Sequence, residues 1–405
     1  MVKTRTVGQP SLLRAINLRA TFDLVASDGP VAAPQVVSVT GLSKPTVSEV
    51  LRQLVELGLV TKVGRTRGQV GPSAQLYDVN PECGWVLGID IGREWVRVVA
   101  ADLSGRAIAR ADERARRRSG RQLVERVDRL VAQVAGETRS SRRRLAVVGT
   151  PGVLRPGESH LALAPQLPGL ERPEVLRDLR DRLACPVVFD NDVNLAAIGE
   201  MTRGAGRGVR DFVMISIGTG LGMAVVLDGR LHRGVSGLAG EIGYLPTGST
   251  EPANLDGNGR WNAGPFERLL SSSAVLELAE EAGLERVSSA EGVIDAARGG
   301  NASAAQIVTT IAERLAQAVA AVAAVLDPAL VILGGGIGAG AGQLLVEPMQ
   351  RVLERISPLR PRFAVSELGS AAVLDGAVTE GLGIVMDEIF QSPNGQVASV
   401  ATANS

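Results

Sequence analysis

The sequence has few of the side chains that build redox and metal centres, with two cysteines and two histidines among its 405 residues. Cys83 and Cys185 lack CxxC spacing, which argues against a disulfide framework and a thiolate zinc site. His160 and His232 are too few for a histidine-rich metal site. We therefore predict a protein that binds neither a metal nor a cofactor.

Aromatic residues and long apolar runs are also scarce. Aromatic side chains make up 3% of the sequence, which argues against a protein that binds nucleic acid by stacking bases. The first ten residues contain no apolar signal region, and no apolar run reaches membrane-spanning length. The longest, residues 315–326, is predicted as a buried core helix. These absences favour a cytoplasmic protein.

Glycine and apolar residues are abundant, and the charge is unevenly distributed. The 48 glycines and 45% hydrophobic content favour an α/β architecture with many tight turns, over two or three domains. The net charge is zero, yet residues 1–80 hold nine lysines and arginines against five acidic residues, including all three lysines of the chain. A basic segment before a more acidic remainder indicates an anionic partner at the N-terminal end.

The N-terminal segment has the helix start and stop signals of a helix-turn-helix. A helix beginning near Ser11 is stopped before Pro30, a second ends at Gly41, and a third begins at Ser43 and ends at Gly58. The third helix is predicted to bury Val47, Val50, Leu51, Leu54, Val55 and Leu57. Residues 59–63 and 74–79 are predicted to form a hairpin wing.

If the third helix is a recognition helix, its N-terminal end enters the major groove of DNA. The predicted groove contacts are Ser43, Lys44, Thr46 and Ser48. Arg52 and Gln53 lie further along, toward the phosphates, and Arg65 and Arg67 of the wing are suited to a narrow minor groove. The alternative is a packing or dimerisation module whose lysines are only solvated.

Residues 189–200 are the polar stretch around which the larger part of the chain is organised. They follow a short apolar strand and precede a helix of small residues, so four polar side chains, Asp190, Asn191, Asp192 and Asn194, fall at a strand end. Open α/β sheets bind ligands there, and these groups suit a polyhydroxylated molecule. An Asx turn that caps the helix is the competing interpretation.

Three further segments have the composition of phosphate loops. Asp90 and Gly92 follow an apolar strand, and a second turn contains Gly218, Thr219, Gly220 and Gly222. A third follows a strand and contains Gly334 and Gly335. Each has a simpler explanation as a tight turn. The basic stretch 110–144 is predicted as a helix with a solvated charged face.

Taken jointly, these motifs resemble the ROK family of repressors and sugar kinases, over nearly the whole chain. The resemblance implies a winged helix-turn-helix at residues 1–80 and a two-lobed actin-like sugar kinase-like module at 81–390 that binds ligand and oligomerises. The composition of residues 391–405 predicts a disordered tail. It also implies a sugar site, with Asp192 at the position of the kinase base. The implied sugar-binding residues are Asn191, Asp192, Glu241, Tyr244 and Glu267. Residues 218–222 and 334–336 match the family's second phosphate loop and its adenosine loop.

The sequence departs from the family's kinases at two places. Tyr244 stands where a histidine is usual, and residues 246–265 contain no cysteine, so the family's zinc is predicted absent. The first phosphate loop of the kinases has the form Asp-x-Gly-Gly-Thr, but here Arg93 and Glu94 replace the last two residues. Because phosphoryl transfer depends on positioning and electrostatic stabilisation, we predict little or no kinase activity.

The resemblance and its departures together predict a sugar-responsive transcriptional regulator, most simply a repressor. Its expected partners are a pseudo-palindromic DNA operator, a sugar or sugar derivative, and further copies of itself as a homodimer or homotetramer in the nucleoid. Two alternatives remain open: an ATP-dependent sugar kinase with an accessory DNA-binding head, and a regulator whose sugar site is vestigial.

Overall fold

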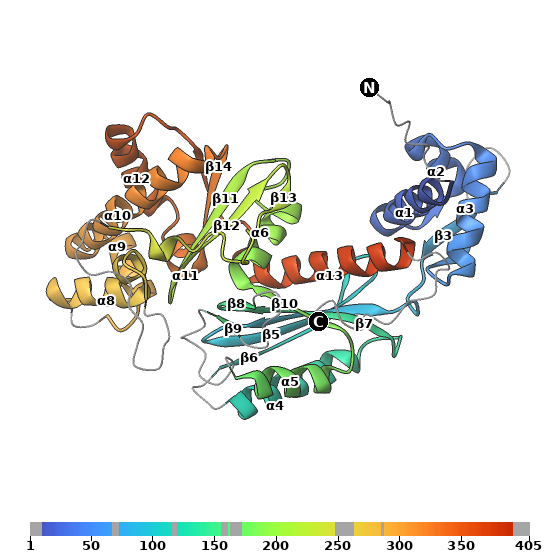
Figure 1. The fold of residues 1–405 in the computed structure, drawn as a ribbon, viewed down its shortest axis with the longest axis horizontal. Helices are drawn as coiled ribbons and strands as arrows, with labels where there is room; N and C mark the ends of the chain where they lie inside the picture. The colour runs from blue at the N-terminus through green and yellow to red at the C-terminus, as the bar shows by residue number, and fades with distance from the viewer. Residues whose placement is uncertain are drawn as a thin grey trace, which may run out of the picture.

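The computed structural model describes residues 10–66, 73–115, 120–154, 161–162, 172–247, 263–284 and 287–391 (Figure 1). Arg67 and the tail from residue 392 lie outside the described residues. The N-terminal elements form a small head: α1 (Pro10–Asp28), β1 (Val31–Ala32), α2 (Ala33–Thr40), α3 (Lys44–Glu56), β2 (Val60–Arg65) and β3 (Gln75–Val79). The three strands pair antiparallel in the order β1-β3-β2 beside the helices, as in a winged helix.

Local sequence signals fix the turn between α2 and α3. Gly41 ends α2 in the left-handed conformation, with φ 69°, and its N–H donates to the Val37 carbonyl. The Ser43 hydroxyl accepts a hydrogen bond from the Thr46 N–H and so caps α3. Both predicted boundaries are confirmed.

The predicted buried face of α3 is confirmed for Val47, Val50, Leu51 and Leu54. It is wrong for Leu57, whose side chain is 37% exposed. The helix has ended at Glu56, so the 3.6-residue periodicity no longer directs position 57 toward the core.

The first lobe of the body is built on a five-stranded sheet in the order β10-β7-β4-β5-β6. Its elements are β4 (Trp85–Ile91), β5 (Trp95–Asp102), β6 (Ala107–Arg114), α4 (Gly120–Ala135), β7 (Arg143–Thr150), β8 (Val153–Leu154), β9 (Leu161–Ala162), α5 (Pro173–Leu183), β10 (Val187–Asn191) and α6 (Asp192–Arg203). The helix predicted over 110–144 is wrong at both ends. Residues 110–114 continue β6, which pairs with β5, and β7 begins at Arg143.

The second lobe is built on a sheet in the order β13-β12-β11-β14-β15. Its elements are β11 (Phe212–Ile217), β12 (Leu221–Leu227), β13 (Arg230–Leu231), η1 (Ile242–Tyr244), α7 (Glu267–Leu270), α8 (Ser272–Glu281), α9 (Ala290–Arg298), α10 (Ala302–Leu326), β14 (Leu330–Gly334), α11 (Gly335–Ala341), α12 (Gln343–Ile356), β15 (Arg362–Val365) and η2 (Gly369–Ala371). In both lobes an antiparallel three-strand meander is extended by two parallel strands. The two lobes therefore repeat one topology.

The chain crosses between the lobes twice, through α6 into β11 and after β15 into α13 (Ala372–Gln391). The two crossing helices pack very closely, because a Cβ on Gly376 would lie 1.7 Å from the Leu195 carbonyl oxygen. Glu200 of α6 is fully buried and joins both crossings. Its carboxylate accepts hydrogen bonds from the Ala205 N–H and from the Ser366 hydroxyl, at 2.8 and 2.5 Å.

Helix α13 runs from the junction of the lobes to the head (Figure 1). At its far end, the rings of Phe390 and Phe22 lie 6.1 Å apart between centroids, and Arg19 forms an ion pair with Asp387 at 3.1 Å. One hydrophobic cluster contains Phe22 of the head, Val86 of the first lobe and Phe390 of α13. The head and the first lobe thus share a core.

Helix α10 and residues 369–390 are long and apolar enough, by length and composition alone, to cross a membrane. Each packs one face into the protein: Leu315 and Val319 of α10 are fully buried in the second lobe, and Met386 of α13 is buried in the core shared with the head. We interpret both as core helices, as predicted for residues 315–326.

Candidate ligand site and nucleic-acid interface

The predicted polar stretch lies at the end of β10 and the start of α6. The Asn191 side-chain oxygen accepts hydrogen bonds from the backbone N–H groups of Val193 and Asn194, at 2.9 and 3.3 Å. Asp190 accepts from the Asn191 N–H and the Asn194 side-chain amide, at 2.8 and 3.1 Å. The capping role considered for this stretch is therefore present, and it fixes the helix start next to Asp192.

The pKa values of four titratable side chains predicted for the sugar site are raised, chiefly by burial. Burial and the nearby Asp90 raise the pKa of Asp192 to about 6. Burial, Glu267 and Asp192 raise the pKa of Glu241 to about 7. Burial also raises the pKa of Glu267, and burial together with both glutamates raises that of Tyr244 to about 12. The structure thus brings these acids together from both lobes.

Glycines allow the second-lobe segments to approach one another. Gly240 has φ +101°, and a Cβ there would lie 1.9 Å from the Met223 carbonyl oxygen of β12. The Phe266 N–H donates to the Gly243 carbonyl at 3.0 Å, and a Cβ on Gly243 would lie 3.3 Å from that of Glu267. These contacts place Glu241 and Glu267 on neighbouring segments.

Arg233 is a site residue that the sequence analysis missed. It follows β13 in the second lobe, and its guanidinium forms ion pairs with Asp190 of the first lobe at 2.6 Å and Glu380 of α13 at 2.9 Å. An isolated arginine on a loop carries no pattern that could have identified it. Arg233 connects the predicted sugar-site strand to the helix that reaches the head.

The phosphate-loop positions are divided between the lobes. Asp90 is 5% exposed and forms an ion pair with Arg97 of β5 at 2.9 Å. Burial raises the pKa of Asp90, and Arg97 opposes that change. Arg93 and Glu94 are exposed in the turn between β4 and β5.

The glycine turns of the second lobe adjoin one another. A Cβ on Gly218 would lie 3.6 Å from the Gly336 N–H nitrogen, and one on Gly222 would lie 3.0 Å from Val193 of α6. Gly335 has φ +77° and packs against the Ile217 carbonyl. Thr219 and Gly220 lie between β11 and β12, and Gly334 ends β14. The two loops could therefore face one ligand.

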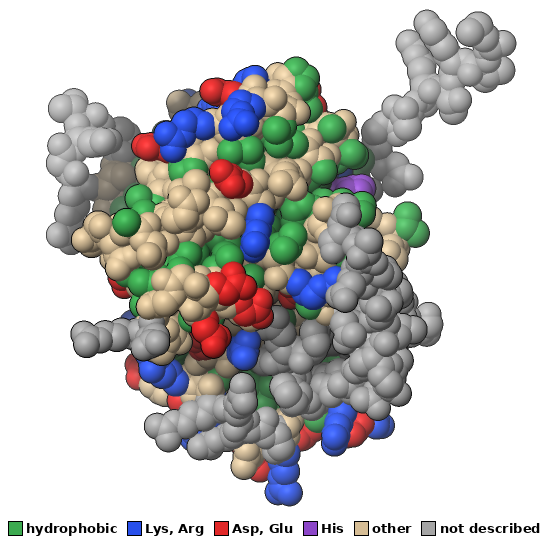
Figure 2. Space-filling model, turned by 90° about the vertical axis from the view of Figure 1, so that its left-hand side faces the viewer, with side chains coloured by type: hydrophobic (Ala, Val, Ile, Leu, Met, Phe, Trp, Pro, Cys, Tyr) green, Lys and Arg blue, Asp and Glu red, His purple; other side chains and the backbone are tan. Residues whose placement is uncertain are grey.

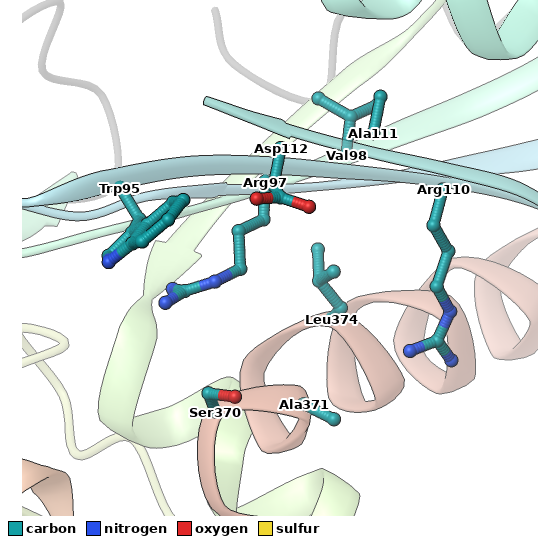
Figure 3. Close-up of a pocket in the computed structure, with 9 residues that line it drawn as sticks. All are labelled: Trp95, Arg97, Val98, Arg110, Ala111, Asp112, Ser370, Ala371 and Leu374. Atoms are coloured by element: carbon teal, nitrogen blue, oxygen red, sulfur yellow. The ribbon is translucent and has the colours of Figure 1, made fainter. Parts of the chain in front are cut away.

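A separate cavity of about 290 Å³ lies between β5, β6 and the start of α13 (Figure 3). It is lined by Trp95, Arg97, Val98, Arg110, Ala111, Asp112, Ser370, Ala371 and Leu374. Its two guanidinium groups already have carboxylate partners, Asp90 for Arg97 and Asp375 for Arg110. We call Asp192, Glu241, Tyr244 and Glu267 the acid cluster. None of them lines this cavity, so the cavity is distinct from the acid cluster.

No metal site emerges in the part of the chain that the structure describes, where no three His, Cys, Asp or Glu side chains are grouped to hold an ion. Residues 248–262, which make up most of the segment where the family's zinc ligands would fall, lie outside that part.

The predicted DNA contacts lie on the outer side of the head. Lys44 and Ser48 are exposed on α3, and Thr46 is half-buried, with its hydroxyl 2.8 Å from that of Ser43. Arg65 is exposed on β2 and donates to the Ser73 carbonyl at 3.2 Å.

Arg52, predicted to lie toward the phosphates, is exposed on α3. It pairs with Glu49 and Glu56 of its own helix. At the opposite end of the molecule, the second-lobe face in Figure 2 shows acidic and basic side chains interspersed.

The head and the two repeated lobes define a helix-turn-helix protein built on the two-lobed, actin-like fold of sugar kinases. A model of the ROK family matches residues 86–386, and a model of the IclR helix-turn-helix domain matches residues 22–64. The chain belongs to the ROK family, as its motifs indicated.

Individual relatives agree with this assignment. The xylose repressor of Caldicellulosiruptor bescii is 25% identical over 392 residues, which cover 92% of this chain and 96% of that protein. A ROK family glucokinase from Streptomyces griseus, solved with glucose and AMPPNP, is 26% identical with a TM-score of 0.62, over 74% of this chain and 99% of its own. The structure of a ROK family transcriptional regulator, a homologue of the E. coli MLC protein, matches with a TM-score of 0.73 at 20% identity. The match covers 94% of this chain and 100% of that one, and at this identity it shows the fold alone.

Proposed function

We propose that this protein is a transcriptional repressor whose binding to an operator is modulated by a sugar or sugar derivative. The observation that carries the proposal is that α13 joins the DNA-binding head to the first lobe and, through Arg233, to the second lobe, since the predicted sugar-site acids come from both lobes. The similarity to a xylose repressor over nearly the full length of both chains supports it. The domain boundaries predicted after residues 80 and 390 are part of the same proposal.

The proposed effector site consists of Asn191, Asp192, Glu241, Tyr244 and Glu267. A sugar presents several hydroxyl groups, and each carboxylate can accept hydrogen bonds from two of them. Such donors replace repulsion between neighbouring acids with attraction, so the ligand favours the arrangement that brings the acids of both lobes around it. The free energy of this preference is what can change the position of the lobes.

The route from effector to operator runs through Arg233 and α13. A ligand that draws the second lobe toward Asp190 alters the ion pairs of Arg233, one of which holds Glu380 of α13. Because α13 shares a core with the head, movement of this helix is transmitted to the head as a rigid displacement. In a homodimer or homotetramer, such displacements change the spacing of two heads on a pseudo-palindromic operator in the nucleoid.

The rival function is an ATP-dependent sugar kinase, as in the glucokinase of similar fold. The glycine turns of the second lobe and Asp192 favour it. The pairing of Asp90 with Arg97 opposes a kinase function, because the Asp90 carboxylate is already engaged. The rest of the first phosphate loop presents the side chains of Arg93 and Glu94 where the kinases have a glycine and a threonine. We infer that turnover is absent or slow, which a coupled ADP-release assay across a panel of pentoses and hexoses measures.

The test of the repressor proposal starts with genomic footprinting, which locates the operator whatever its sequence. Gel shifts on that operator are then repeated with the same sugars. We expect one sugar to change the operator Kd, and the Asp192→Asn variant to bind operator but lose this response. Absence of DNA binding at low ionic strength refutes the proposal. Operator binding that no sugar alters, with no heat of sugar binding by calorimetry, shows instead that the sugar site is vestigial.

A further inference from the structure

The outward face of α3 contains acids as well as bases. Burial of Val47, Val50, Leu51 and Leu54 turns the opposite side of the helix to solvent. That side presents the charged residues Lys44, Glu49, Arg52 and Glu56. A duplex that docks on α3 therefore meets two carboxylates together with two cations, and this helix cannot attract phosphates by net charge.

Of the two carboxylates, Glu49 accepts more side-chain hydrogen bonds than Glu56. Its oxygens accept hydrogen bonds from Arg52 at 2.6 and 3.0 Å and from the Gln53 side-chain amide. Arg14 of α1 donates in turn to Gln53 at 2.8 Å. The side chain of Glu49 nevertheless remains 50% exposed, so its carboxylate retains lone pairs that face solvent. These hydrogen bonds orient the carboxylate, and those from Arg52 and Gln53 lower the pKa of Glu49.

A fixed carboxylate has few favourable partners on DNA. Phosphate oxygens repel it, and desolvating it without a hydrogen-bond donor is costly. In the major groove the exposed donors are the exocyclic amino groups of cytosine and adenine. Glutamate accepts from cytosine N4, whereas glutamine pairs in a bidentate manner with adenine. Glu49 lies six residues after the N-cap Ser43, less than two turns into α3, within the part of a recognition helix that contacts bases.

We propose that Glu49 is a base-reading residue of the recognition helix, whose carboxylate accepts a hydrogen bond from the exocyclic amino group of a cytosine in each operator half-site. Arg52 and Gln53 are positioning residues that hold this carboxylate toward the groove. The inference rests on the proposed DNA-binding function and names part of its sequence specificity.

Glu56 provides a matched control. It also pairs with Arg52, but it is the last residue of α3, seven positions after Glu49 and away from the end that enters the groove. If Glu49 served only to hold Arg52, the Glu49→Gln and Glu56→Gln variants would behave alike. If Glu49 reads a base, only its own replacement changes base preference.

The experiment is a selection from a pool of DNA duplexes with a randomised central segment, using the full-length wild-type protein and the variants E49Q, E49A and E56Q. We expect the wild type to prefer cytosine at one position in each half-site by on the order of tenfold. E49Q should transfer that preference to adenine and E49A should abolish it, with other positions unchanged, while E56Q should select the wild-type sequences. Because both glutamates are exposed, thermal melting should be the same for all four proteins.

Other outcomes overturn the inference in distinguishable ways. If E49Q and E49A enrich the wild-type sequences, or if E56Q changes the same position as E49Q, Glu49 does not read a base although the protein still binds DNA. If the wild type enriches no sequence even at low ionic strength, the proposed function fails and the inference fails with it.

Discussion

The core shared by the head and the first lobe can be broken at Phe390. Its side chain is 9% exposed and its ring lies against Phe22 of the head. Replacing a core phenylalanine with alanine typically costs about 3 to 5 kcal/mol, and the position of Phe390 at the edge of the cluster favours a loss of about 3 kcal/mol. A domain the size of the head buries too little surface to tolerate that loss easily. Phe390→Ala should therefore let the head unfold before the body.

Two optical signals separate the head from the body. All three tryptophans follow residue 80, so tryptophan fluorescence reports unfolding of the body, whereas far-UV circular dichroism also reports the helices of the head. In urea, the wild type should give coincident transitions by both signals. In Phe390→Ala the dichroism should begin to change at a lower urea concentration than the fluorescence.

Phe266→Ala is the control, because Phe266 is 3% exposed in the core of the second lobe and does not contact the head cluster. This variant should move the fluorescence transition as well as the dichroism. If Phe390→Ala shifts both signals together, or shifts neither, the head is not stabilised through α13 and the proposed route from effector to operator loses its physical basis.

Three further predictions concern the junction of the lobes. Replacing the buried Glu200 with Gln should lower the free energy of unfolding by about 3 kcal/mol, measured by urea denaturation, since an amide nitrogen cannot accept from the donors that surround the carboxylate. Because the pKa of Asp192 is raised to about 6, its ionisation destabilises the folded state: the stability present below pH 4 is lost as pH rises through 6. Asp192→Asn should therefore gain about 2 kcal/mol relative to wild type between pH 4.5 and pH 7.5, and an equal difference at both pH values would contradict this. Arg233→Gln, which leaves Asp190 without its cation, should bind operator but lose the response to sugar in gel shifts, whereas the exposed control Arg230→Gln should keep it.

The head could be predicted closely because its signals are local. Gly41 and Ser43 act through their own backbone conformation and a hydrogen bond three residues away, so the sequence contains all the information needed to mark the turn. The periodicity of α3 similarly identified its buried face. Its failure at Leu57 has the same physical origin, since periodicity holds only while the helix continues.

The sequence identified the acidic residues of the candidate site but not its arginines. Strand-end carboxylates such as Asp192 form a recognisable motif, and the resemblance to a family added Glu241 and Glu267. Arg233 acquires its role only when the fold brings the distant Asp190 to it, and Arg97 only when β4 and β5 pair and bring Asp90 to it. The repeated topology of the lobes was also invisible, because two sheets can share strand order without sharing side chains.

The electrostatics of the acid cluster favour a ligand site over a structural role. Carboxylates whose pKa values rise to about 6 and 7 are less stable ionised than they would be in water, so Asp192 and Glu241 reduce the stability of the folded protein at neutral pH. Asp90 and Asp190, by contrast, each have an arginine partner within 3 Å. Arginines thus neutralise Asp90 and Asp190, whereas Asp192 and Glu241 repel one another. Asp192 and Glu241 therefore remain available to accept hydrogen bonds from a ligand. Hydroxyl groups of a bound sugar can donate such hydrogen bonds. Binding should therefore lower the pKa values of Asp192 and Glu241 and release protons near pH 6.5, which calorimetry in buffers of different ionisation enthalpy would detect.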